Sequence, residues 1–319
     1  VTSAVLVALG TALSGFWILA ANSWMQTPAG HVTRGGIAYP VDWLAVIFNP
    51  SFPYRFAHMF TAAYLTTSLV VASVGARYML AGKYQAHART MLHMGLGMVA
   101  ILAPLQAVIG DQHGLNTLQH QPQKVAAIEA HWQDEGPIPL VLFAWPDEKA
   151  EVNNFEIAVP RLGSIILTHS LDGRIKGLKD FAVTDRPPVK VPFFAFRAMV
   201  GVGFLLIAIG FAGVWLWYRG KLYDTRWYLS VLRWSWPLGF IAILSGWYVT
   251  EVGRQPWLAT DIIRTADAVS PVPASAVIFT LTLFVLVYCI VFSMGIYYIN
   301  RLIVHGPARD SLHDADGDA

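Results

Sequence analysis

The sequence predicts an all-α membrane protein, a polytopic bundle of about six transmembrane helices with a polar loop on its outer face. Of its 319 residues, 55% are hydrophobic and only 13% are charged, which is too apolar for a water-soluble domain of average composition. Apolar runs of about 20 residues, the length that crosses ~30 Å of hydrocarbon, lie at 2–21, 55–76, 90–110, 193–217, 228–251 and 273–300. Composition and run length together predict this fold class.

The connections between these runs predict the orientation of the chain. The basic residues of alternate connections are Arg77, Lys83 and Arg89, then Arg219, Lys221 and Arg226, and finally Arg301 and Arg309. Because basic connections stay in the cytoplasm, the opposite connections at 22–54 and 252–272 and the polar stretch 111–190 are predicted to lie outside. We therefore expect transmembrane helices in 1–110 and 191–304, an outer loop at 111–190 and a cytoplasmic tail at 305–319.

Three smaller features limit the interpretation. The net charge is +2 and the basic residues lie in connections, so the sequence does not predict binding to nucleic acid. Cys289 is the single cysteine and falls inside the last run, where we expect a small buried thiol and no disulfide framework. The chain starts with Val1 almost inside an apolar run, and we therefore expect it to lack upstream helices.

Two side chains that can ligate iron lie at the same predicted depth. His58 and Met199 are each about two helical turns inside the outer end of a different run, at a rise of ~1.5 Å per residue, and so are candidates for the axial pair of a haem. The alternative is a methionine that fills the core and a histidine at the interface. Glu251 lies near the same face, followed by Arg254. A carboxylate in a bilayer needs a metal, a cation or a proton pathway, and a structural Glu251–Arg254 ion pair is the simpler alternative.

Four motifs give the chain a family resemblance. They are residues 21–30 (ANSWMQTPAG), 123–129 (QKVAAIE), 196–200 (FRAMV) and 246–257 (GWYVTEVGRQPW). In this order they resemble subunit I of cytochrome bd-type quinol oxidase. The resemblance covers essentially the whole chain and implies the fourth to ninth helices of a nine-helix subunit. The family's haem d ligands would then lie in an absent N-terminal third.

The resemblance implies specific haem contacts. His58 and Met199 match the axial ligands of the low-spin haem b, an imidazole and thioether pair that raises the reduction potential and favours electron transfer over oxygen binding. Glu251 matches the ligand of the high-spin haem b. Trp247 resembles an aromatic residue between haems, and Arg197 is expected beside haem propionates.

The polar loop contains the expected quinol site. Gln121, Lys124 and Glu129 lie in a segment of helical composition and match the family's quinol-binding loop. A carboxylate beside a cation can accept the protons of a quinol, although the same residues also fit an ordinary solvated helix face. The loop is short, so the chain resembles the short-loop branch that includes the cyanide-insensitive type.

Several polar and small residues leave two interpretations open. Ser14 and Asn22, eight positions apart in the first run, match residues of a proton path, but such residues also join helices. His93 lies near the cytoplasmic end of its run and is expected to pack or hydrogen-bond rather than bind haem. Close approach of a macrocycle or of another helix is expected at Gly201, Gly203, Gly210 and Gly213.

The function that the resemblance implies is a terminal quinol oxidase subunit of the bacterial cytoplasmic membrane. It would oxidise quinol at the periplasmic face and pass electrons through haems b to haem d for reduction of oxygen, generating a proton motive force. Subunit II, a small accessory subunit, quinol, oxygen and membrane lipid are the expected partners, and this chain alone is expected to be inactive. The alternatives are a haem b quinol dehydrogenase-like subunit that does not reduce oxygen, and a transporter with a His58–Glu251 proton relay.

Overall fold

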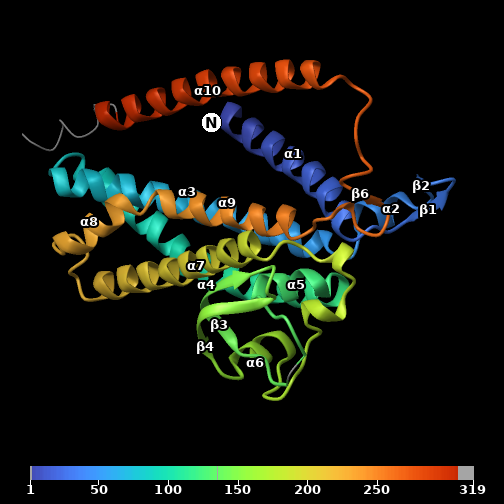
Figure 1. The fold of residues 1–319 in the computed structure, drawn as a ribbon. Coiled ribbons are helices and arrows are strands. Elements are labelled where there is room, and N and C mark those ends of the chain that lie inside the picture. Colours follow the sequence, from blue (N-terminus) through green and yellow to red (C-terminus); the bar gives the residue numbers. More distant parts are fainter. Residues whose placement is uncertain (1, 135, 308–319) are drawn as a thin grey trace, which may run out of the picture.

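Six long helices dominate the computed structural model, which describes residues 2–134 and 136–307 (Figure 1). The helices and helix pairs long and apolar enough to cross a membrane are α1 (Thr2–Gln26), α3 (Phe52–Ala81), α4 (Gln85–His120), α7 (Lys190–Tyr218), α8 with α9 (Arg226–Trp234 and Pro237–Val252) and α10 (Ala274–His305). The predicted fold class and the six predicted spans are confirmed; each helix extends beyond the C-terminal end of its apolar run, α4 by ten residues.

The fifth span is divided into two helices. Its helices α8 and α9 are separated by Ser235 and Trp236, and Pro237 occupies the first turn of α9. A backbone N–H in the first turn of a helix has no partner within the helix, so a proline, which lacks this N–H, does not destabilise α9 there. The same proline prevents α8 from continuing into α9.

The apolar core lies between α3, α4, α7 and α8. Helices α3 and α4 run antiparallel and are joined at Gly82, whose φ of +65° closes the C-terminus of α3. The buried side chains include Leu69 of α3, Leu92 of α4, Leu206 of α7 and Leu229 of α8. Burial of these side chains fixes how the four helices pack.

The predicted outer loop has structure of its own. Helix α4 continues to His120, so the first ten residues of the loop are helical, and α5 (Pro122–Glu129) follows. The antiparallel strands β3 (Leu140–Asp147) and β4 (Val152–Val159), helix α6 (Leu162–Thr168) and the 3-10 turns Leu178–Asp180 and Val183–Asp185 complete it. Figure 1 shows this lobe beside the end of the bundle where α7 begins.

Two further hairpins and a short helix lie at the same end of the bundle. They are β1 (His31–Arg34) with β2 (Ile37–Pro40), β5 (Trp257–Ala259) with β6 (Ile263–Arg264), and α2 (Trp43–Ile47). Asp42 caps α2 by accepting bonds from the backbone N–H groups of Leu44 and Ala45. These segments and the lobe surround the ends of the helices that carry the predicted site.

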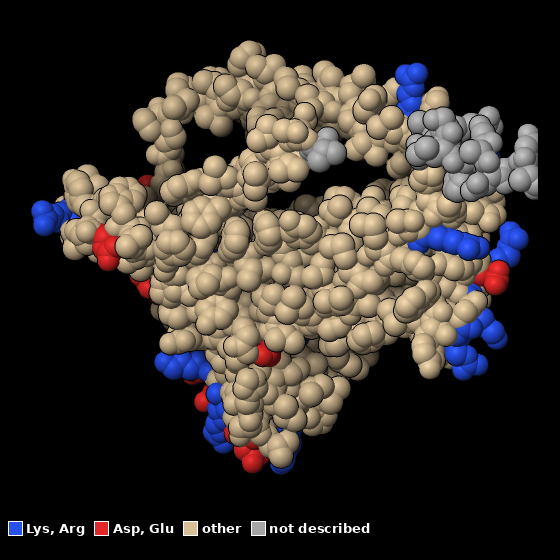
Figure 2. All heavy atoms as spheres, turned by 180° about the vertical axis from the view of Figure 1, so that it is seen from behind, with Lys and Arg blue, Asp and Glu red and all other residues tan. Residues whose placement is uncertain are grey.

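Charged side chains avoid the middle of the bundle. In Figure 2 they lie at the two ends and on the loop lobe, and a wide belt without Lys, Arg, Asp or Glu separates them. This is the pattern of a membrane-spanning protein.

Helix α10 stands apart from the rest of the bundle (Figure 1). It has no buried residue, and Cys289 within it is exposed. The expectation of a buried thiol is therefore wrong for the described chain, because no other helix of this chain covers that position. Of the predicted tail, residues 308–319 lie outside the described residues, and His305 still belongs to α10.

Candidate functional site

His58 lies on α3 and faces α4. The Nε2 atom of Gln106 is 3.2 Å from each ring nitrogen of His58 and 3.1 Å from its carbonyl oxygen. The ring of His113 lies 5.6 Å from that of His58, centre to centre. Both Gln106 Oε1 and His113 Nε2 are buried without a hydrogen-bond partner. His58 is thus held in a polar environment with unused hydrogen-bonding capacity.

Met199 lies on α7 and faces α9. A Cβ atom at Gly246 would be 3.1 Å from the Met199 sulfur, so the glycine allows the thioether to approach the neighbouring helix. His58 and Met199 are both only partly buried and both lie near the N-terminal end of their helix. The structure places them at the same end of the bundle, each beside a different neighbouring helix.

Glu251, in the last turn of α9, has two partners. Asn22 of α1 donates a 2.7 Å hydrogen bond to its Oε1 atom, and Arg254 donates a 2.6 Å bond to Oε2. The Arg254 side chain is only 5% exposed, and its Nε and Nη1 atoms have no hydrogen-bond partner. The ion pair considered above is therefore present, and it leaves donors free for a further group.

Lys124 is buried rather than solvated. Its Nζ atom donates bonds of 2.6 Å to Gln26 Oε1 and 3.3 Å to Gln121 Oε1, and its residue is 2% exposed. Burial lowers the pKa of the Lys124 ammonium well below its usual range, and the guanidinium groups of Arg55 and Arg254 lower it further. The solvated-face alternative is thus wrong for Lys124.

Gln26 and Gly253 join this lysine to the bundle. Gln26, the last residue of α1, accepts bonds from Lys124 and from Gln121 Nε2 at 3.2 Å. A Cβ atom at Gly253 would lie 3.0 Å from Lys124 Cε, so the aliphatic part of the lysine side chain packs against the backbone between Glu251 and Arg254. The Lys124 cluster and the Glu251–Arg254 pair are therefore immediate neighbours.

Glu129 points to a different place. It is 6% exposed and pairs with Arg197 at 2.7 Å, while the Arg197 guanidinium also donates to the carbonyl oxygens of Ile128 and Val141. Arg197 therefore fastens α5 and β3 to α7. Its expected role beside a haem propionate stays a prediction.

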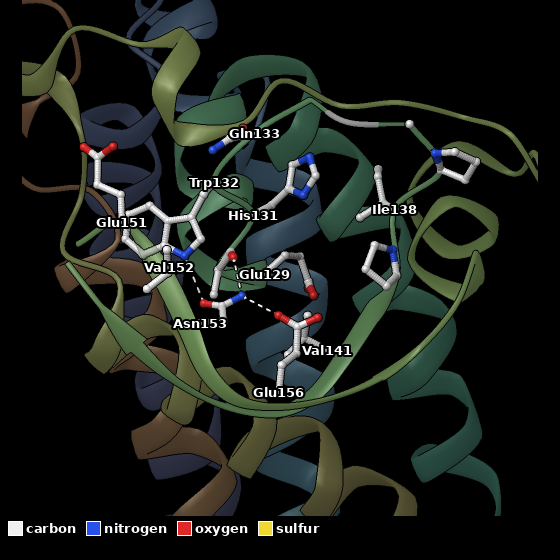
Figure 3. Close-up of a pocket in the computed structure, with 14 residues that line it drawn as sticks. Glu129, His131, Trp132, Gln133, Ile138, Val141, Glu151, Val152, Asn153 and Glu156 are labelled. Carbon is white, nitrogen blue, oxygen red and sulfur yellow. Dashed lines mark hydrogen bonds between the residues drawn. The ribbon is translucent and has the colours of Figure 1, made fainter. Parts of the chain in front are cut away.

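A pocket of about 420 Å³ opens beside Glu129 (Figure 3). Its walls come from the end of α5, the following segment and both strands of the β3–β4 hairpin. The titratable residues among its lining are Glu129, His131, Glu151 and Glu156. Lys124 and Gln121 do not line it, so the predicted quinol residues divide between this pocket and the Gln26 cluster.

Other predicted residues lie around these groups. Ser14 is exposed on α1 and Asn22 binds Glu251, which connects only the second of the two to the site. Trp247 packs against the cluster of Leu19, Ala20 and Phe52.

The predictions for the small residues and His93 have mixed outcomes. His93 hydrogen-bonds to Tyr223, which confirms a hydrogen-bonding role. Helix packing explains Gly210, beside Ala100, and Gly213, beside Leu96, whereas a Cβ at Gly201 or Gly203 would meet no atom within 4 Å.

Four further residues, Gln26, Gln106, His113 and His131, lie at or beside this end of the bundle and were not predicted from the sequence. Gln26 belongs to one of the family motifs but was not selected as a site residue. Gln106 and His113 gave a usable signal, since polar residues at seven-residue spacing lie on one face of a helix. His131 gave no signal, because its surroundings form only when the loop folds.

The geometry defines a polytopic membrane protein with buried ionisable side chains at one end of its helices. Over residues 1–307 the sequence matches the family described as Cytochrome bd terminal oxidase subunit I, and the chain belongs to that family.

Individual relatives agree with this assignment. The chain is 34% identical to Cytochrome bd ubiquinol oxidase subunit 1 of Bacillus subtilis, over 97% of this chain and 68% of that one. It is 30% identical to Cytochrome bd-II ubiquinol oxidase subunit 1 of Escherichia coli, over 95% and 72%. The structure of bd oxidase from Geobacillus thermodenitrificans superposes with a TM-score of 0.86 at 30% identity, covering 94% of this chain and 69% of that one.

Proposed function

We propose that this chain oxidises quinol at the outer face of the bacterial cytoplasmic membrane as subunit I of a cytochrome bd-type oxidase complex with subunit II. It is a quinol:oxygen oxidoreductase subunit of the respiratory chain. The observation that carries the proposal is the contact of Lys124 with Gly253, because it joins the proposed quinol residues to the segment holding Glu251 and Arg254.

The side chains at this end fit haem as the cofactor. Imidazole and thioether are haem ligands, and His58 and Met199 are both partly accessible. Arg254, beside Glu251, has two buried guanidinium nitrogens without hydrogen-bond partners. Buried donors are normally paired, so these two nitrogens are available to bind an acidic group of a cofactor. His58 and Met199 would hold the low-spin haem b, and Glu251 the high-spin haem b. Bound haem supplies one-electron steps between a two-electron donor and oxygen.

Different side chains handle protons at the two faces of the membrane. Buried Lys124 has a lowered pKa, and its Nζ atom, which bonds to Gln26 and Gln121, can also hydrogen-bond to a quinol oxygen. Glu129 receives a quinol proton at the outer face. Asn22, bonded to Glu251, supports a path for protons that come from the cytoplasm along α1. Release of protons outside and uptake inside generates a membrane potential without a pump.

The experiment that tests this function is a pair of isosteric replacements in the oxidase complex. Lys124→Met and Glu129→Gln should each lower quinol-driven oxygen consumption by about 10²-fold, the low end of acid–base contributions, and leave the haem spectrum intact. Lys176→Met, at an exposed lysine of the same loop, is the matched control. Equal loss of haem and activity would instead assign the two residues a folding role.

A reduced-minus-oxidised spectrum of the membranes separates this function from its alternatives. A haem d band together with haem b is expected of the oxidase. Haem b alone would indicate a quinol dehydrogenase-like subunit, and the lack of any haem band a transporter.

A small change at Gly253 should disturb the quinol residues. In Gly253→Ala the new methyl group would lie 2.5 Å from the Val249 carbonyl oxygen and 3.0 Å from Lys124 Cε, so the end of α9 and the lysine must shift apart and the amine is displaced. The KM for quinol should rise by up to about tenfold, less than the ~10²-fold that a 1 Å misplacement can cost. Steady-state kinetics measures this, with Gly295→Ala on α10 as control because a Cβ there meets no atom within 4 Å and the position lies away from the proposed haem ligands. An unchanged KM would contradict a role for the Lys124 position in binding.

A further inference from the structure

His131 lies at the end of α5, fixed beside the pocket next to Glu129. Its backbone N–H donates to the Ala126 carbonyl at 2.8 Å, and its carbonyl accepts from the Leu178 N–H at 2.9 Å. One side of the ring is hydrogen-bonded to the backbone of Ile175, while Nε2 is buried and has no partner. A ring that donates from Nδ1 to a carbonyl leaves Nε2 as an unprotonated base.

The charges around this base favour the passage of cations. Carboxylates act electrostatically on His131 from α5 (Glu129), from the following segment (Asp134) and from the turn at 178–180 (Asp180). Glu151 and Glu156 line the same pocket from the hairpin (Figure 3), whereas no described lining residue is a lysine or an arginine. Lys179 and Arg186 pair with Glu151 from outside the pocket.

The inner side of Glu129 offers no way out for a proton. Its Oε2 atom is paired with Arg197, and a guanidinium is already fully protonated and accepts no hydrogen bond. A proton that arrives on Glu129 must therefore leave toward the pocket. At about 420 Å³ the pocket has room for roughly ten water molecules, enough to connect His131 with the surface.

We infer that His131 carries quinol protons from Glu129 to the outer surface through this pocket. The inference rests on the proposed quinol oxidation. The quinol O–H bond breaks as its proton goes to Glu129, and its two electrons would be taken up by the haem of the proposed function, with oxygen as the final oxidant. The proton then moves from Glu129 to His131 Nε2, which is closed to solvent in this ring position, and rotation of the ring toward the pocket that it lines passes it to pocket water, which restores both residues. Two such passages release the two protons of each quinol.

The pKa of His131 fits this role. Burial lowers it below the ordinary 6.5, opposed in smaller part by the Ile175 hydrogen bond and the carboxylates of Asp134, Glu129 and Asp180. The imidazole is therefore neutral at pH 7 and ready to accept a proton. Activity should fall as the pH falls through this lowered pKa, because a protonated ring cannot accept another proton.

The test is His131→Gln in the complete oxidase complex, reconstituted in liposomes. We expect kcat for quinol to fall about tenfold, less than for a direct acid–base group because pocket water still conducts some protons. The acidic limb of the pH profile should disappear, while KM and the haem spectrum stay unchanged. His169→Gln, at an exposed histidine of the same loop, should behave as the unchanged chain.

Chemical rescue distinguishes a relay from a structural histidine. In His131→Ala, imidazole added to the outer solution should enter the pocket and restore most of the lost rate. A His131→Gln complex with an unaltered kcat and pH profile overturns the inference, as does a His131→Ala loss that imidazole does not restore. If the unmodified complex oxidises no quinol, the proposed function itself fails, which is a different result from either.

Discussion

Met199→Leu should convert the low-spin haem b signal to a high-spin signal or remove it, with little unfolding. Leucine keeps the apolar volume, and such exchanges typically cost less than about 1.5 kcal/mol, but it has no sulfur to bind iron. Quinol-driven oxygen consumption should fall with the signal, because loss of the thioether also lowers the reduction potential of the iron. Absorption and electron paramagnetic resonance spectra of the membranes measure the spin state.

Met59→Leu is the matched control for this prediction. Met59 lies next to His58 on α3 and packs against the cluster of Leu19, Ala20 and Phe52, so its replacement tests packing at the same depth. An unchanged low-spin spectrum in Met199→Leu would refute the axial assignment. A change in both variants would indicate that packing, and not ligation, sets the signal.

Glu251→Gln should remove the high-spin haem b signal. Oxygen consumption should fall by more than the ~100-fold that loss of a residue hydrogen-bonded to a metal ligand can cost, because Glu251 is proposed as the ligand itself. The amide keeps the size of the side chain but removes the charge that pairs with Arg254. That guanidinium is 5% exposed and already has two nitrogens without partners, so it would be left as an uncompensated buried cation.

Haem extraction with separate counts of low-spin and high-spin signals checks this prediction. Tyr248→Phe, at an exposed position one turn earlier on α9, should leave both signals in place. A full haem complement and undiminished turnover in Glu251→Gln would mean that Glu251 serves only as the ion-pair partner of Arg254.

The spans could be predicted because they depend on a local property, the length of an apolar run. The Glu251–Arg254 pair was also within reach, since residues three apart are neighbours on a helix. Arg197 illustrates the limit. It lies two residues from Met199, and about 200° of helix rotation separates the two side chains, so the arginine faces the loop lobe and binds Glu129 instead.

The burial of Lys124 could not be predicted from the sequence. The segment 122–129 has a polar, helical composition that fits a solvated surface equally well. Its burial depends on Gln26 and Gly253, which lie 98 and 129 positions away along the chain, and on the folded lobe that covers α5. The β3–β4 hairpin escaped prediction because its register contains two irregularities, which interrupt the alternation of polar and apolar residues that identifies a strand.

The separation of α10 from the other helices bears on the order of biogenesis. None of the apolar clusters described in the chain includes a residue of this helix, and its contacts include the hydrogen bonds from Tyr78 and Tyr84 to carbonyl oxygens near its end. A lipid-inserted helix satisfies its own backbone hydrogen bonds. The preceding five spans can therefore insert, pack and form the Glu251–Arg254 and Glu129–Arg197 ion pairs while α10 is still being synthesised.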